Sequence, residues 1–135
     1  MLKDFTVIEI VKTLGPLTVI IEPNKLRFVK SVVEAMEYTP YVHYLIDNKG
    51  KRFAIQLCKE KEVQAVPFSK PVAEQGAKAV LYQNQELVSV IRSLMPDWNA
   101  EMKYSVNGVY SKADKAVVFN LQEAEEYSRR INRYE

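Results

Sequence analysis

The chain has 135 residues and a formal net charge of +2, with 47% hydrophobic and 27% charged residues. These values are typical of one soluble domain over residues 1–135, with enough apolar side chains for its own core. No apolar run approaches the roughly 20 residues that a membrane-spanning helix needs. The single cysteine excludes an internal disulfide framework, and one cysteine with one histidine cannot form a structural zinc site alone.

The N-terminal residues predict two strands, Phe5–Val11 and Leu17–Ile21, separated by a Gly-Pro turn. Asp4 and Glu9, together with the lack of a small-residue cleavage pattern, argue against a signal peptide. We therefore expect a cytoplasmic protein with no membrane partner.

Residues 17–68 predict a first strand–helix–hairpin unit. Polar and apolar residues alternate in its strands, apolar residues recur at helical spacing between Val29 and Met36, and Thr39-Pro40 ends the helix. An Asp-Asn-Lys-Gly stretch predicts the tight turn of the hairpin. The predicted strand, helix and two hairpin strands are Lys25–Phe28, Val32–Tyr38, Tyr41–Ile46 and Arg52–Leu57.

Residues 77–122 repeat the same order, with a linker between the units at Ser69–Gln75 and a longer hairpin turn at Asn107–Lys115. The predicted elements are Ala79–Tyr82, Glu86–Met95, Met102–Val109 and Ala116–Leu121. Apolar or aromatic residues match between the units: Val32 with Ile91, Met36 with Met95, Tyr44 with Tyr104, Ile46 with Val106, Phe53 with Val117, Ile55 with Phe119 and Leu57 with Leu121. An internal duplication explains these matches, and chance alternation is the competing explanation.

Two such units would bury their apolar faces against each other, which predicts an α+β fold with a barrel-like core. The residues that we expect in that core are Phe28, Val32, Met36, Ile46, Phe53, Ile55, Ile91, Met95, Val106, Val117 and Phe119. Residues 123–135 predict a C-terminal helix, because acidic helix formers come first and Arg129, Arg130 and Arg133 come last.

The order of elements from Thr18 to Lys59 resembles the AbrB-type, or swapped-hairpin, DNA-binding domain. The matching stretches are Lys25-Leu26-Arg27-Phe28, Val32–Tyr38, and Tyr44-Leu45-Ile46-Asp47 through Arg52-Phe53-Ala54-Ile55. Two such units in one chain look like the MraZ proteins. Pro23-Asn24-Lys25 replaces the glycine-plus-arginine turn of the family, and Val29-Lys30 stands where a proline usually follows the strand.

The resemblance implies that Lys25, Arg27 and Lys30 face DNA, with Lys51 and Arg52 at the hairpin tip as secondary contacts. Basic side chains bind phosphate and guanine edges. The same residues also have a simpler explanation, since lysines protect a sheet edge from aggregation and charged side chains keep a hairpin tip solvated.

Two functions follow from these observations. The first is a DNA-binding transcription regulator or DNA-associated accessory protein, with double-stranded DNA and a second copy of the chain as candidate partners. The second is a non-enzymatic protein-interaction module, which the altered turn and the small net charge favour. No nucleotide-binding or catalytic motif supports an enzyme, and no cofactor is expected. His43 and Cys58 are interpreted as structural residues.

Overall fold

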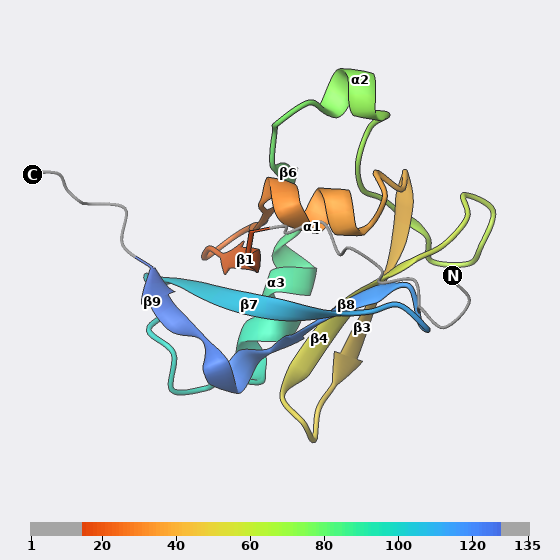
Figure 1. Cartoon of the computed structure of the whole chain (residues 1–135). Coiled ribbons are helices and arrows are strands. Elements are labelled where there is room, and N and C mark those ends of the chain that lie inside the picture. Colours follow the sequence, from red (N-terminus) through yellow and green to blue (C-terminus); the bar gives the residue numbers. More distant parts are fainter. Residues whose placement is uncertain (1–14, 128–135) are drawn as a thin grey trace, which may run out of the picture.

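The computed structural model describes residues 15–127 of the chain (Figure 1). Its strands are β1 Leu17–Ile21, β2 Leu26–Phe28, β3 Tyr41–Asp47, β4 Arg52–Leu57, β5 Val66–Pro67, β6 Val80–Tyr82, β7 Lys103–Ser111, β8 Ala116–Asn120 and β9 Glu125–Tyr127. Its helices are α1 Lys30–Ala35, α2 Val72–Gln75 and α3 Gln85–Ser93, with a 3-10 turn at Leu121–Glu123. Sheet and helices together make the mixed α+β fold that the sequence predicts.

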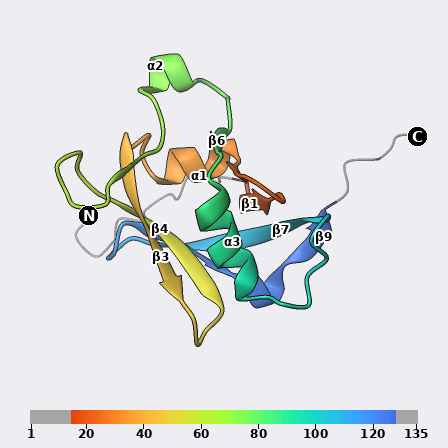
Figure 2. The same cartoon turned by 180° about the vertical axis from the view of Figure 1, so that it is seen from behind.

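One antiparallel sheet runs through these residues in the order β5-β3-β4-β8-β7-β1-β2-β6, and β9 pairs with β7 beside this path. The sheet curls into a half-barrel, while α2 stands apart from it on the connection between β5 and β6 (Figures 1 and 2). The side chain of Asn84 caps α3 by accepting a 2.9 Å hydrogen bond from the N–H of Leu87. No helix in this part of the chain is long and apolar enough to cross a membrane.

The apolar faces of the sheet and of α1 and α3 meet in one core. All the core residues expected from the sequence are buried in this cluster except Ile46 and Met95, which are half-buried and pack against it. Phe119 on β8 stacks on Phe53 of β4 at 5.0 Å between ring centroids and contacts Phe28 of β2 at 6.1 Å. The strand phases that the sequence predicts are therefore correct.

Two predicted features differ from the structure. The predicted turn at Asn107–Lys115 is shorter, because β7 continues to Ser111 and places Gly108 inside the strand. The C-terminal helix predicted over 123–135 is wrong in its described part, because Glu125–Tyr127 form β9. β8 pairs with β7 only from Gly108 onward, so the start of β7 offers free backbone groups that β9 uses. Residues 128–135 and the predicted strand Phe5–Val11 lie outside the described residues.

Candidate functional site

Three basic side chains surround one carboxylate at the turn between β1 and β2. Glu22 directly follows β1 and is only 7% exposed. Its carboxylate oxygens lie 4.0 Å from Lys25 Nζ, 3.5 Å from Arg27 Nε and 3.7 Å from Lys103 Nζ. We call Glu22, Lys25, Arg27 and Lys103 the Glu22 cluster. Because three positive charges share one negative charge, the cluster keeps a positive excess at its surface.

The sheet order brings these residues together from distant parts of the sequence. Ile21 at the end of β1 pairs with Leu26 on one side and with Tyr104 on the other. Lys103 therefore lies beside the β1–β2 turn. The sequence predicts Lys25 and Arg27 as contact residues but gives no signal for Lys103, because only the pairing of β7 with β1 places Lys103 beside the turn.

Arg92 of α3 links this turn to the loop before β7, since its Nη1 lies 3.5 Å from the carbonyl oxygens of Ile21 and Glu22. Its Nη2 donates to the carbonyl oxygens of Asn99 at 2.8 Å and Met102 at 3.1 Å. Its guanidinium carbon lies 5.7 Å from the ring centroid of Trp98 and 5.6 Å from that of Tyr104. Burial lowers the pKa of Arg92 from its usual value. Since its donors are already engaged by the backbone, Arg92 acts as a scaffold for the loop that precedes β7.

Lys30 lies outside the Glu22 cluster, although the sequence grouped it with Lys25 and Arg27. Its Nζ is 3.8 Å from the carboxylate of Glu34, four residues later on α1. Such exposed helix pairs contribute only a few tenths of a kcal/mol. The Lys30 side chain is therefore paired weakly and stays solvated.

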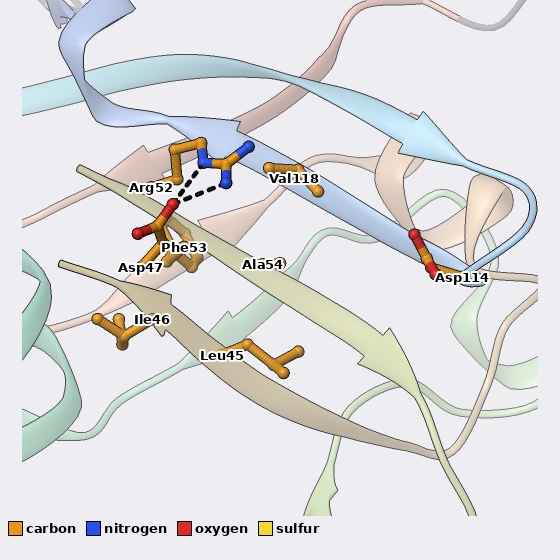
Figure 3. Close-up of a pocket in the computed structure, with 8 residues that line it drawn as sticks. All are labelled: Leu45, Ile46, Asp47, Arg52, Phe53, Ala54, Asp114 and Val118. Atoms are coloured by element: carbon orange, nitrogen blue, oxygen red, sulfur yellow. Dashed lines mark hydrogen bonds and ion pairs between the residues drawn. The ribbon is translucent and has the colours of Figure 1, made fainter. Parts of the chain in front are cut away.

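The tip of the β3–β4 hairpin forms a second basic site, which projects away from β1 (Figure 1). Arg52 Nε and Nη2 donate to Asp47 Oδ2 at 2.9 and 2.7 Å (Figure 3). The N–H of Gly50 donates to Asp47 Oδ1 at 3.0 Å. Lys51 has a positive φ of 56° and no ion pair among the described residues. The structure therefore separates Lys51 and Arg52 from the Glu22 cluster and neutralises Arg52 with Asp47.

These contacts lower the pKa of Asp47, and this effect can be tested by titration. Its pKa is lowered first by the Gly50 N–H and then by Arg52. We expect the Asp47 carboxyl carbon to titrate below the usual aspartate range in an NMR experiment, and Arg52→Ala to raise that midpoint only in part because the Gly50 contact remains. Lys59→Ala on the opposite end of β4 should leave the midpoint unchanged. A midpoint in the ordinary range for the wild-type chain would contradict the turn geometry.

The outer face of the sheet carries an apolar row across four neighbouring strands. Leu45, Ala54, Val118 and Val109 stand opposite one another on β3, β4, β8 and β7. Leu45 is 43% exposed and Val109 is 71% exposed. Three of these residues, Leu45, Ala54 and Val118, line a shallow hollow of about 280 Å³ beside Arg52 (Figure 3). This outer row is apolar surface that the described residues leave uncovered.

The contacts of His43 and Cys58 agree with the structural role that the sequence predicts for them. His43 Nε2 lies 2.9 Å from the carbonyl oxygen of Val63, and Cys58 is buried with a raised pKa caused by desolvation. In residues 15–127, no group of three or more His, Cys, Asp or Glu side chains is placed to hold a metal ion. The excess positive charge of the Glu22 cluster favours an anion as its ligand.

Comparison of the chain with protein-family models, curated proteins and solved structures finds no match.

Proposed function

We propose that the protein binds double-stranded DNA as a transcription regulator or DNA-associated accessory protein of AbrB-like type. The Glu22 cluster is the main contact, through Lys25, Arg27 and Lys103. The observation that carries this proposal is the excess of three cations over one buried carboxylate at one turn. Side chains of this kind neutralise phosphates and release counterions.

The strand pairings support the swapped-hairpin part of the proposal. The hairpin of the second predicted unit pairs with a strand of the first, because β7 pairs with β1, whereas β3 pairs with β5 inside the first unit. The units also meet directly, with β2 antiparallel to β6 and β4 antiparallel to β8. An exchange of hairpins between two units accounts for the three pairings that join them, β1 with β7, β2 with β6 and β4 with β8.

The registers support the internal duplication. Phe53 matches Val117 in the sequence, and Ile55 matches Phe119. Exchanging the two units turns the observed pair Phe53–Phe119 into Val117–Ile55, which is also an observed pair. The same exchange turns Leu26–Tyr82 into Val80–Phe28 on β2 and β6. Chance alternation explains the apolar spacing but gives no reason for both registers to be symmetric.

The remaining predicted residues have a secondary place in this proposal. Lys30 and Arg52 are each paired with a carboxylate, and Lys51 lies at the separate hairpin tip. We expect these three side chains to add phosphate contacts only when a long duplex reaches both sites.

The test is a fluorescence titration of mixed-sequence duplex DNA at several salt concentrations. Replacing Lys25, Arg27 and Lys103 by alanine should weaken binding and flatten the log–log salt slope by about one unit for each lost phosphate contact. Glu22→Gln should act in the opposite direction, because it removes the central negative charge and preserves the shape of the side chain. Both variants change the same turn, so opposite effects exclude a shared folding defect.

Lys59→Ala with Lys61→Ala serves as the matched control, since it removes positive charge from an exposed loop far from the Glu22 cluster in sequence. This control should leave the salt slope almost unchanged. If the wild-type chain fails to bind duplex DNA at low salt, or if Glu22→Gln weakens binding as much as the triple variant, the DNA proposal is wrong.

The outer row favours a second candidate function, a non-enzymatic interaction module that packs on a second copy of this chain. Asp47 and Arg52 lie opposite each other beside the row and form an ion pair, so this border of the row carries no net charge that would repel a second copy. Light scattering then shows a dimer that Leu45→Asp dissociates. A monomer at high concentration excludes this candidate.

A further inference from the structure

A cavity of about 450 Å³ lies beside the β1–β2 turn and is lined by α3 and the loop that follows it. Its wall includes Pro23 of the turn, the polar side chains of Gln85, Ser89 and Arg92 on α3, and the indole of Trp98. This volume, and this mixture of apolar surface with a few polar groups, are typical of small-molecule sites. The four residues of the Glu22 cluster do not line the cavity, so it is a second feature of the same turn.

The ring of Trp98 keeps one face available for a planar ligand. Its other face stacks on Tyr104, with 4.2 Å between ring centroids and 11° between ring planes. The guanidinium carbon of Arg92 is almost equally far from the two centroids, at 5.7 and 5.6 Å, so it lies beside the edges of the stacked pair and covers neither outer face. The N–H of Asn99 donates to the Tyr104 hydroxyl at 2.7 Å, which holds the loop and its indole in place.

Two polar side chains of α3 that line the cavity are available for a ligand. Gln85 and Ser89 are four residues apart, which places them on one face of the helix. Both are exposed, and neither side chain makes a hydrogen bond within residues 15–127. Ser93, one turn later, instead donates to the carbonyl oxygen of Val90 at 2.6 Å. A free amide and a free hydroxyl can bind the polar edge of a flat ring.

The basic residues of the Glu22 cluster lie on the other side of the same turn. Lys103 and Tyr104 are neighbours on β7, so their side chains point to opposite faces of the sheet. Lys103 reaches Glu22, while Tyr104 packs on Trp98 at the cavity. Pro23, which directly follows Glu22, lines the cavity itself. A ligand that uses both places must carry a planar ring and negative charge, and it must extend around the turn.

We propose that the cavity binds one unpaired base of a single-stranded DNA segment, while neighbouring phosphates of that segment contact the Glu22 cluster. This inference rests on the proposed DNA binding and extends it to DNA with unpaired bases. A base has the flat π surface that stacks on Trp98, and its edge carries donors and acceptors for Gln85 and Ser89. A single strand can place a base on one side of the turn and its next phosphates on the other, because the base is free of a pairing partner.

The fluorescence of Trp98 tests this inference, because Trp98 is the only tryptophan of the chain and lines the cavity. The probe is an oligothymidylate of about eight nucleotides, which is within the usual site sizes of single-strand-binding folds. We expect it to quench Trp98 in the full-length chain at low salt. Thymidine monophosphate should need a concentration at least about tenfold higher, because it lacks the further phosphates that bind the cluster. Blunt duplex DNA should bind without this quenching.

Ser89→Leu places a larger apolar side chain in the cavity and leaves the reporter Trp98 intact. It should remove the quenching by oligothymidylate and lower the affinity about tenfold, the effect of losing one stacked base. Blunt duplex DNA should bind this variant as it binds the wild type, because the Glu22 cluster is unchanged. Val90→Leu is the matched control and should leave the quenching unchanged, since Val90 is the next residue of α3, is 46% exposed and does not line the cavity.

Absence of Trp98 quenching by oligothymidylate in the wild type would overturn the inference, as would equal quenching of Ser89→Leu and Val90→Leu. Equal potency of thymidine monophosphate and the oligonucleotide would separate the cavity from the Glu22 cluster and would also overturn it. Failure of the proposed function is a different result, namely no binding of blunt duplex DNA at low salt. Quenching by the single strand without duplex binding would support the cavity as a base site and reject duplex binding.

Discussion

Phe119→Ala is expected to destabilise the protein by about 3–5 kcal/mol, the usual range for deleting a large aromatic side chain from a core. Phe119 is fully buried, stacks on Phe53 and contacts Phe28, so it joins β8, β4 and β2. Its removal takes away apolar burial and leaves a cavity where three strands meet. Urea denaturation monitored by circular dichroism measures the change in the free energy of unfolding.

Val109→Ala on β7 is the matched control for this substitution. Val109 is one strand away from Phe119 but lies on the solvent face of the sheet. Its truncation should change the stability by about 0.5 kcal/mol or less. A cost below about 1 kcal/mol for Phe119→Ala would show that the ring is not in the core.

Gly108→Ala is the second substitution with a large expected effect, about 1–3 kcal/mol of destabilisation, which is typical of overpacking. A Cβ atom at Gly108 would lie 2.6 Å from Val117 Cγ1 and 2.7 Å from Phe119 Cε1, closer than real Cβ contacts. β8 or the Phe119 ring would have to move to accept the methyl group. The same denaturation experiment measures this cost.

Gly15→Ala is its control, because a Cβ atom there meets nothing within 4 Å. This substitution should leave the stability nearly unchanged. If Gly108→Ala and Gly15→Ala have the same free energy of unfolding, β7 does not approach Phe119 as closely as described. If Gly108→Ala alone is destabilised, the glycine is required by packing inside a strand, which differs from the turn position that its sequence context indicates.

The Glu22 cluster shows which residues of a candidate site can be predicted from the sequence and which cannot. The basic residues Lys25 and Arg27 stand out because they are close together on one predicted strand. Lys103 gives no such signal, since its partner Glu22 is far away in the sequence. The carboxylates that neutralise Lys30 and Arg52 are near them in the sequence, but spacing alone does not say whether two side chains turn toward each other.

The sequence by itself determined most of the strands and helices and their buried faces, because alternation and helical spacing are local properties of the chain, but it did not determine α2 or β9. The two hairpins, α3 and the core around Phe119 follow from it. Only the tertiary structure decided the order of the strands, the pairing of β9 with β7 and the meeting of Lys103 with Glu22. The reason is physical: strand pairing satisfies backbone groups that are remote in sequence, and an open edge recruits residues such as Glu125–Tyr127 against their helical preference.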